Sequence, residues 1–239
     1  MSRRPYCAAM RRLGLIFLCL LAGNLRAAVP PLLAEVVQRW TAEDARWTFT
    51  QLVKEYDGAN VAEERVEHYD ISRGETQRWA LISINGRKPT PEEVTAFNKR
   101  KNRPRFFAPR PAVEYLDLEN ARIVKEDERS VSYDLPLGRT AAWLLPGDKI
   151  SLVVTIDKQT RSLERGRVEL GGPFSIALGL AKVIDLDVDL ELPPGDEKSP
   201  ADATQAKGSG YAVVNKLGRR IEYTWTEFTR IPAPAGTTR

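Results

Sequence analysis

The sequence contains very few of the residues on which redox and metal chemistry depend. Among 239 residues there are two cysteines, Cys7 and Cys19, and one histidine, His68. Both cysteines lie within the first 27 residues, so a chain that loses this segment has no thiol for a disulfide or a cysteine–metal site. One histidine without thiols cannot assemble the common zinc ligand sets within one chain. We therefore predict no metal and no cofactor.

Recognisable catalytic motifs are also absent. The sequence has no glycine-rich phosphate loop and none of the patterns Ser-x-x-Lys, Gly-x-Ser-x-Gly or His-x-x-x-His. A histidine acting as general base needs a nucleophile and an orienting acid. Asp70 and Ser72 are near His68 in sequence, but no motif joins them, and we interpret His68 as a surface or edge residue of a strand. We predict no catalytic residues, and a hydrolase is the weakest alternative.

The N-terminus has the pattern of a secretory signal peptide. Arginines at positions 3, 4, 11 and 12 precede the apolar run 13–22, and small residues follow at Ala27 and Ala28. Ten apolar residues span about 15 Å as a helix, roughly half of the hydrocarbon core of a bilayer. We expect cleavage near Ala27 and export to the periplasm. The alternative is a retained N-terminal anchor.

The charge balance changes when this leader is set aside. The full chain has 36 basic and 32 acidic residues, a formal net charge of +4. Residues 1–27 contribute five arginines and no acid, which leaves 31 basic against 32 acidic residues. Nucleic-acid binding needs an excess of basic groups to replace phosphate counterions. We therefore predict no nucleic-acid partner.

The remaining sequence predicts a mainly β, single domain over residues 28–231. Apolar spacing predicts a helix over 31–40, and Thr90, Pro91 and Glu93 form a capping-box signature for a second helix that ends near Lys101. Residues 193–210 are expected to form a polar loop, and residues 232–239 a disordered tail. Period-two patterns predict strands at 47–53, 61–71, 77–85, 122–126, 129–135, 149–156, 162–170, 184–192, 208–215 and 220–230.

Two segments of the second half have alternative interpretations. Asp185, Asp187, Asp189 and Glu191 alternate with apolar residues and share one face of a strand, where we expect them to pair with residues such as Arg165 and Arg167 rather than hold Ca²⁺. The longest apolar stretch, 171–184, is a buried strand or helix–loop, or alternatively a flexible flap over a cavity.

These elements predict an α+β fold that is mainly β, with one large antiparallel sheet and two short helices. Two short helices supply little apolar area to cover a sheet of about ten strands. Part of the apolar face is therefore expected to be open to a ligand.

The element order resembles the periplasmic lipoprotein-carrier family, LolA/LolB-like. The resemblance rests on the leader, the amphipathic helix, the strand Trp47-Thr-Phe-Thr-Gln51 and the strand–turn–helix block 78–94, and it covers about Leu32 to Ile231. It implies an unclosed half-barrel whose concave face is covered by short helices. It also implies a monomeric binding or carrier protein for a lipid or lipoprotein acyl chain, with transient contact to a membrane surface. The alternative is a structural or adaptor domain that acts through protein contacts and has no cavity.

Candidate site residues follow from this interpretation. Apolar side chains on the strands, the second helix and the loop after it are expected to line a lipid cavity: Trp47, Phe49, Trp79, Leu81, Val94, Phe97, Phe106, Phe107, Leu152, Val154 and Trp225. A basic cluster is expected to face a headgroup or phosphate: Lys99, Arg100, Lys101, Arg103 and Arg105. The alternative for this cluster is a solvated helix end.

Overall fold

The computed structural model describes residues 29–42, 46–102, 115–138, 148–176, 179–192 and 204–231. The predicted leader 1–27, the tail 232–239 and residues 193–203 lie outside these ranges. No helix among the described residues combines the length and apolar character needed to cross a bilayer.

The described chain forms one antiparallel sheet of 12 strands. The main order is β3-β2-β1-β12-β11-β9-β7-β6-β5-β4, with β10 beside β12 and β8 beside β9. The strands are β1 (Arg46–Asp57), β2 (Asn60–Asp70), β3 (Trp79–Ile84), β4 (Arg122–Glu126), β5 (Ser130–Leu135), β6 (Ile150–Asp157), β7 (Ser162–Leu170), β8 (Phe174–Ile176), β9 (Ala181–Glu191), β10 (Thr204–Gln205), β11 (Lys207–Lys216) and β12 (Arg219–Ile231).

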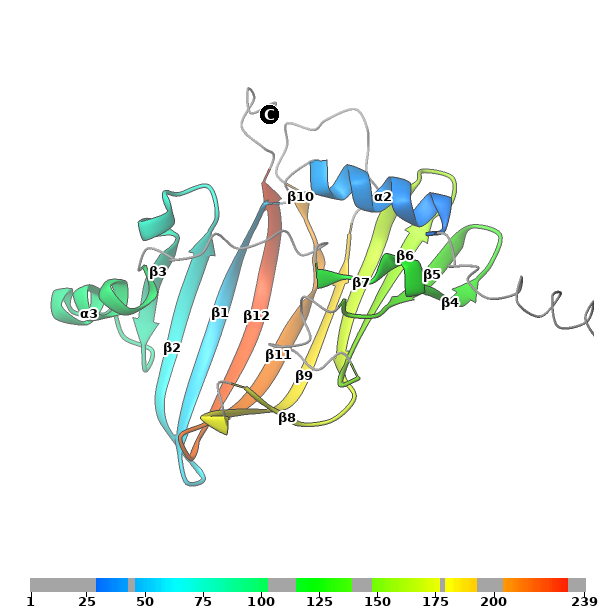
Figure 1. Cartoon of the computed structure of the whole chain (residues 1–239). Coiled ribbons are helices and arrows are strands. Elements are labelled where there is room, and N and C mark those ends of the chain that lie inside the picture. Colours follow the sequence, from blue (N-terminus) through cyan, green and yellow to red (C-terminus); the bar gives the residue numbers. More distant parts are fainter. Residues whose placement is uncertain are drawn as a thin grey trace, which may run out of the picture.

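The sheet is curved and does not close, which confirms the predicted mainly β half-barrel. Its edges, β3 and β4, lie at opposite sides of Figure 1 and do not pair with each other. Register shifts interrupt several strand pairs, including β1 with β12 and β9 with β11. An extra residue in one strand of a pair bends that strand and increases its twist, which favours a curved sheet.

Within the described ranges, two α-helices and two 3-10 turns accompany the sheet: α2 (Pro31–Ala42), α3 (Pro91–Lys101), η1 (Glu75–Gln77) and η3 (Leu118–Asn120). In α2, Leu33, Val36 and Val37 are buried at helical spacing, and they pack on β5 and β6. Figure 1 shows α2 across this end of the sheet and α3 beside β3, at the other end. We call the sheet face covered by α2 the inner face.

The predicted capping box of α3 is confirmed. The Thr90 hydroxyl accepts a hydrogen bond from the Glu93 backbone, and the Glu93 carboxylate accepts one from the Thr90 backbone. Beyond the helix, the Asn102 amide bonds both backbone groups of Trp79, at 3.0 and 2.9 Å. This side chain satisfies polar groups of edge strand β3 that would otherwise be open to another strand.

The prediction of a loop over 193–210 was wrong for its last part, because β10 and the beginning of β11 lie within it, whereas the overlapping strand prediction for 208–215 is confirmed. Gly208 and Gly210 gave the segment its loop-like composition. In the structure Gly208 has a φ of 129°, and Gly210 lies directly under Trp225 in the sheet. Both glycines are needed for local geometry within a strand.

On the outer face, the alternating acids of β9 pair across strands as predicted. Asp189 is bound by Arg165, and Asp187 lies 3.7 Å from Arg167. Asp185 accepts a hydrogen bond from the Tyr211 hydroxyl. Within the described ranges no group of three potential metal-ligating side chains occurs.

Candidate functional site

The inner face carries one continuous row of paired residues across nine strands. From β3 to β5 the row is Leu81, Glu67, Gln51, Trp225, Gly210, Val188, Val168, Leu152 and Leu135. Side chains on one row point to the same side of a sheet. The row therefore places a polar region on β1 and β2 and an apolar region from β9 to β5 on the same surface.

The apolar region contains a hollow of about 310 Å³. Every residue that lines it is apolar: Leu137, Ile150, Leu152, Val168, Phe174, Val183, Leu186, Ala212 and Val214. The volume is at the lower end of the roughly 300–1,000 Å³ range typical of ligand sites. A hollow with this lining excludes charged groups, because it offers no hydrogen-bond partner for them.

The hollow lies beside the region that α2 covers. Val131, Tyr133 and Ile156 pack under α2 in the core, whereas the first residues of β6 and β9 and the last residues of β11 line the hollow. Leu152 belongs to the hollow and also packs against the α2 core. Within the described residues, α2 thus covers part of the β5–β7 surface, and the hollow lies next to that part.

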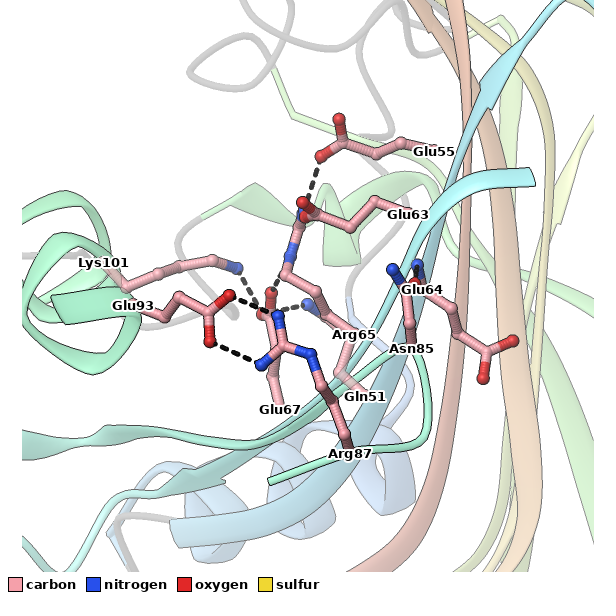
Figure 2. Close-up of polar contacts among 10 residues, drawn as sticks. All are labelled: Gln51, Glu55, Glu63, Glu64, Arg65, Glu67, Asn85, Arg87, Glu93 and Lys101. Atoms are coloured by element: carbon pink, nitrogen blue, oxygen red, sulfur yellow. Dashed lines mark hydrogen bonds and ion pairs between the residues drawn. The ribbon is translucent and has the colours of Figure 1, made fainter. Parts of the chain in front are cut away.

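The polar region of the row is a buried charge cluster, shown in Figure 2. Glu67 is 0% exposed and accepts hydrogen bonds from Gln51 at 2.8 Å and from Arg65 at 3.2 Å. The Lys101 ammonium of α3 lies 2.8 Å from Oε2 of Glu67, the carboxylate oxygen that Gln51 also contacts. A buried carboxylate with three such partners is compensated, whereas an unpaired one is strongly destabilising.

Arg65 joins this cluster to the surface. Its guanidinium also contacts Glu55 at 2.7 Å and Glu63. Burial alone lowers the pKa of Arg65, but the hydrogen bonds to Glu55 and Glu63 outweigh it and hold the pKa above its ordinary value. The arginine is therefore charged at any physiological pH.

Trp225 connects the cluster to the apolar region. Its indole N–H donates to Gln51 at 2.8 Å, and its ring lies parallel to that of Tyr223. Burial, followed by the charges of Glu67 and Glu55, raises the pKa of the Tyr223 hydroxyl. The hydrogen-bond chain from Trp225 through Gln51 to Glu67 fixes the indole beside Gly210, next to the apolar half of the row.

The structure does not gather the predicted lining residues at one site. Leu152 lines the hollow, and Val154 is buried under α2. Phe49 and Trp79 lie together, with ring centroids 5.7 Å apart, in an aromatic cluster on β1–β3. The others are Trp47, half-buried on β1; Leu81, half-buried on β3; Trp225, bonded to Gln51; and Val94 and Phe97 on α3. Phe106 and Phe107 lie outside the described residues.

The predicted headgroup residues are only partly accessible. Lys101 points to Glu67 and lies 4.2 Å above the Trp79 ring, so its charge is already compensated. Arg100 lies 5.9 Å from the Phe97 ring centroid, and Lys99 is exposed. Arg103 and Arg105 lie outside the described residues. His68, interpreted as a surface or edge residue, is half-buried on β2, where Nδ1 is 3.3 Å from the Thr50 hydroxyl.

Sequence reasoning missed most of the hollow and, apart from Lys101, the members of the charge cluster. Phe174 and Val183, which line the hollow, fall within the apolar stretch 171–184. One interpretation of that stretch was a flexible flap over a cavity. The other lining residues alternate with polar ones on ordinary strands, so the sequence does not distinguish them from core. Arg65 and Glu67 look like solvated charges, because the facing groups Gln51 and Lys101 are remote in sequence.

Comparisons with known proteins do not assign the chain to a family. No model of a known protein family matches the sequence, and no curated protein matches it. Among solved structures, MucB in complex with MucA(peri) aligns over 88% of this chain and 95% of that chain, with 9% identity and a TM-score of 0.22. An alignment with so low a TM-score supports no functional assignment, and the LolA/LolB-like resemblance stays a prediction.

Proposed function

We propose that this chain is an exported, periplasmic binding protein that holds one acyl chain, or a similar unbranched apolar group, in the hollow of the inner face. The observation that carries the proposal is the hollow itself, with nine apolar lining residues and no polar one. The leader-like sequence of residues 1–27 supports export. The presence of a hollow favours ligand binding over the alternative of an adaptor domain with a fully packed sheet.

The size and lining of the hollow define the ligand class. A volume of about 310 Å³ suits a single chain rather than several. Because the lining has no polar group, the polar end of an amphiphile must remain outside it. Transfer of each methylene from water contributes about 0.8 kcal/mol, so affinity is expected to rise about fourfold per added carbon until the hollow is filled.

A pair of variants on β11 tests the proposal. Ala212 lines the hollow, and its neighbour Val213 faces the opposite side of the sheet. We expect Ala212→Phe to fill the hollow and to weaken binding of a fluorescent fatty acid at least tenfold, while Val213→Phe retains binding. Fluorescence titration of both variants measures this, with far-UV circular dichroism as the folding control.

Native mass spectrometry and organic extraction of the protein purified after export provide an independent test. We expect an acyl lipid to co-purify with the wild type and not with Ala212→Phe. A lipid-free wild type that also fails to bind fluorescent fatty acids of any length contradicts the proposal. If Ala212→Phe does not fold, the smaller change Ala212→Val takes its place, with a correspondingly smaller loss of affinity.

A further inference from the structure

The turn between β11 and β12 exposes a large apolar side chain in an unfavourable position. Leu217 is 73% exposed, the highest value among the exposed large hydrophobic residues of the described chain. Its φ is 50° and that of Gly218 is 81°, while Lys216 pairs with Arg219 across the turn. Two-residue turns with two positive φ angles favour Asn-Gly, and a leucine is disfavoured there by its Cβ. Neither solvation nor backbone geometry explains the choice of leucine.

A second exposed leucine lies beside the first. The Leu217 backbone N–H donates to the Leu180 carbonyl at 3.1 Å, and Leu180 is 59% exposed. Val61, on the adjacent β1–β2 hairpin, is 48% exposed. Figure 1 shows the β11–β12 turn, the β1–β2 turn and β8 at the same end of the sheet. The two most exposed large apolar side chains of the described residues, Leu217 and Leu180, therefore protrude from the same end of the half-barrel, with Val61 on the hairpin beside them.

Basic residues surround the two leucines. The exposed side chains of Lys182, Lys216, Arg219 and Arg220 belong to the same strand ends. In the described part of the chain, the only carboxylate paired with any of these four is Glu222, which contacts Arg220. On the adjacent β1–β2 hairpin, Asp57 lies at the turn, and the nearby Glu55 and Glu63 are both paired with Arg65. The surface thus combines protruding leucines with a net positive charge.

We propose that this surface, the leucine–basic tip formed by Leu180, Leu217, Lys182, Lys216, Arg219 and Arg220, docks on the anionic phospholipid surface of a bilayer. Leucine side chains insert at the boundary of the acyl chains, and the basic groups face lipid phosphates. This chemistry accounts for an exposed leucine in a turn that suits asparagine, because insertion into the bilayer removes its side chain from water. Lys99, Arg100 and Lys101 of the basic cluster predicted from the sequence lie on α3, beside β3 and apart from this tip (Figure 1).

The tip is close to the hollow along the strands. Val214 and Val183 line the hollow and are each three residues from a tip leucine, Leu217 and Leu180 respectively. Three residues of a strand span about 10 Å. A docked tip therefore holds the hollow within about one acyl-chain length of the bilayer surface. The docking itself does not depend on the proposed ligand.

Vesicle co-sedimentation of the protein recovered after export tests the docking. The probes are vesicles of phosphatidylcholine with phosphatidylglycerol and vesicles of phosphatidylcholine alone, each at low and high salt. We expect binding to the anionic vesicles at low salt, release at high salt, and little binding to the neutral ones. All variants share the same N-terminus, so differences between them do not reflect residues 1–27.

Two tip variants and one control decide the outcome. Leu217→Asn suits the turn better, so it is expected to fold at least as stably as the wild type while partitioning about tenfold less to vesicles. Lys216→Gln with Arg219→Gln is expected to lower partitioning about 25-fold, from about fivefold per charge. The control Ile123→Asn removes an exposed apolar side chain from β4 and is expected to bind as the wild type does.

Failure of the docking proposal is separable from failure of the ligand proposal. The docking is refuted if the wild type does not bind anionic vesicles, or if both tip variants bind them as well as the wild type does. Ala212→Phe is expected to bind vesicles normally, because Ala212 does not belong to the tip. Conversely, Leu217→Asn is expected to take up a fluorescent fatty acid from solution with wild-type affinity.

Discussion

Gly210 has no side chain at the point of β11 where Trp225 lies across the sheet. A Cβ at this position would be 2.9 Å from a Val188 methyl carbon and 3.2 Å from the Trp225 ring. Contacts this short force one of the neighbours to move. The sequence predictions for Gly210 overlapped, as the end of the loop 193–210 and as part of the strand 208–215. Neither indicated these contacts, because the registers that bring Val188 and Trp225 to Gly210 are long-range.

The substitution Gly210→Ala is therefore expected to destabilise the protein by about 1–3 kcal/mol, the usual range for overpacking a filled site. Gly166 of β7 is the matched control, because a Cβ there meets nothing within 4 Å. Gly166→Ala is expected to be neutral or slightly stabilising. Urea unfolding followed by tryptophan fluorescence measures both, and equal midpoints for the two variants would contradict the packing argument.

At the scale of the element, α3 was predictable because its signals are local. Thr90, Pro91 and Glu93 specify the beginning of the helix within four residues, and the structure contains the predicted capping box. The contact of Lys101 with Glu67 was not predictable, because it depends on where β2 lies relative to the helix end. Local chemistry thus fixes the helix, and the sheet decides the partners of its last turn.

The capping box of α3 predicts a pH dependence. Hydrogen bonds from Arg87 and from the Thr90 backbone lower the pKa of Glu93 to about 2, from an ordinary value of 4.5. A lowered carboxylate pKa adds stability above the unfolded value and loses it as the pH falls towards the folded value. We expect the contribution of Glu93 to be complete above about pH 4.5 and to disappear between there and about pH 2.

Thermal unfolding of the wild type and of Glu93→Gln measures this contribution. The stability difference between them is expected to be largest at neutral pH and to vanish near pH 2. Glu92→Gln, in the same first turn, is the control and is expected to follow the wild-type pH profile more closely. A difference between Glu93→Gln and the wild type that does not change with pH contradicts the role of the carboxylate charge.

At the scale of the whole molecule, β12 joins two parts of the sheet. It pairs with β1 on one side and β11 on the other, so the N-terminal strands β1–β3 reach the rest of the sheet through the last strand of the chain. We expect one cooperative unfolding transition, with coincident tryptophan fluorescence and far-UV circular dichroism. Deletion of residues 217–231 is expected to prevent folding of β1–β3 as well. Two separated transitions in the wild type would falsify this expectation.

The sequence by itself determined the fold class, most strand positions, the cap of α3 and the outer-face pairing of Arg165 with Asp189, because these follow from period-two patterns and short-range chemistry. Only the tertiary structure decided the hollow, the compensation of buried Glu67 and the proximity of Leu180 to Leu217. Each of these depends on register between strands remote in sequence, and a shift by one residue would turn the same side chains to the opposite face of the sheet.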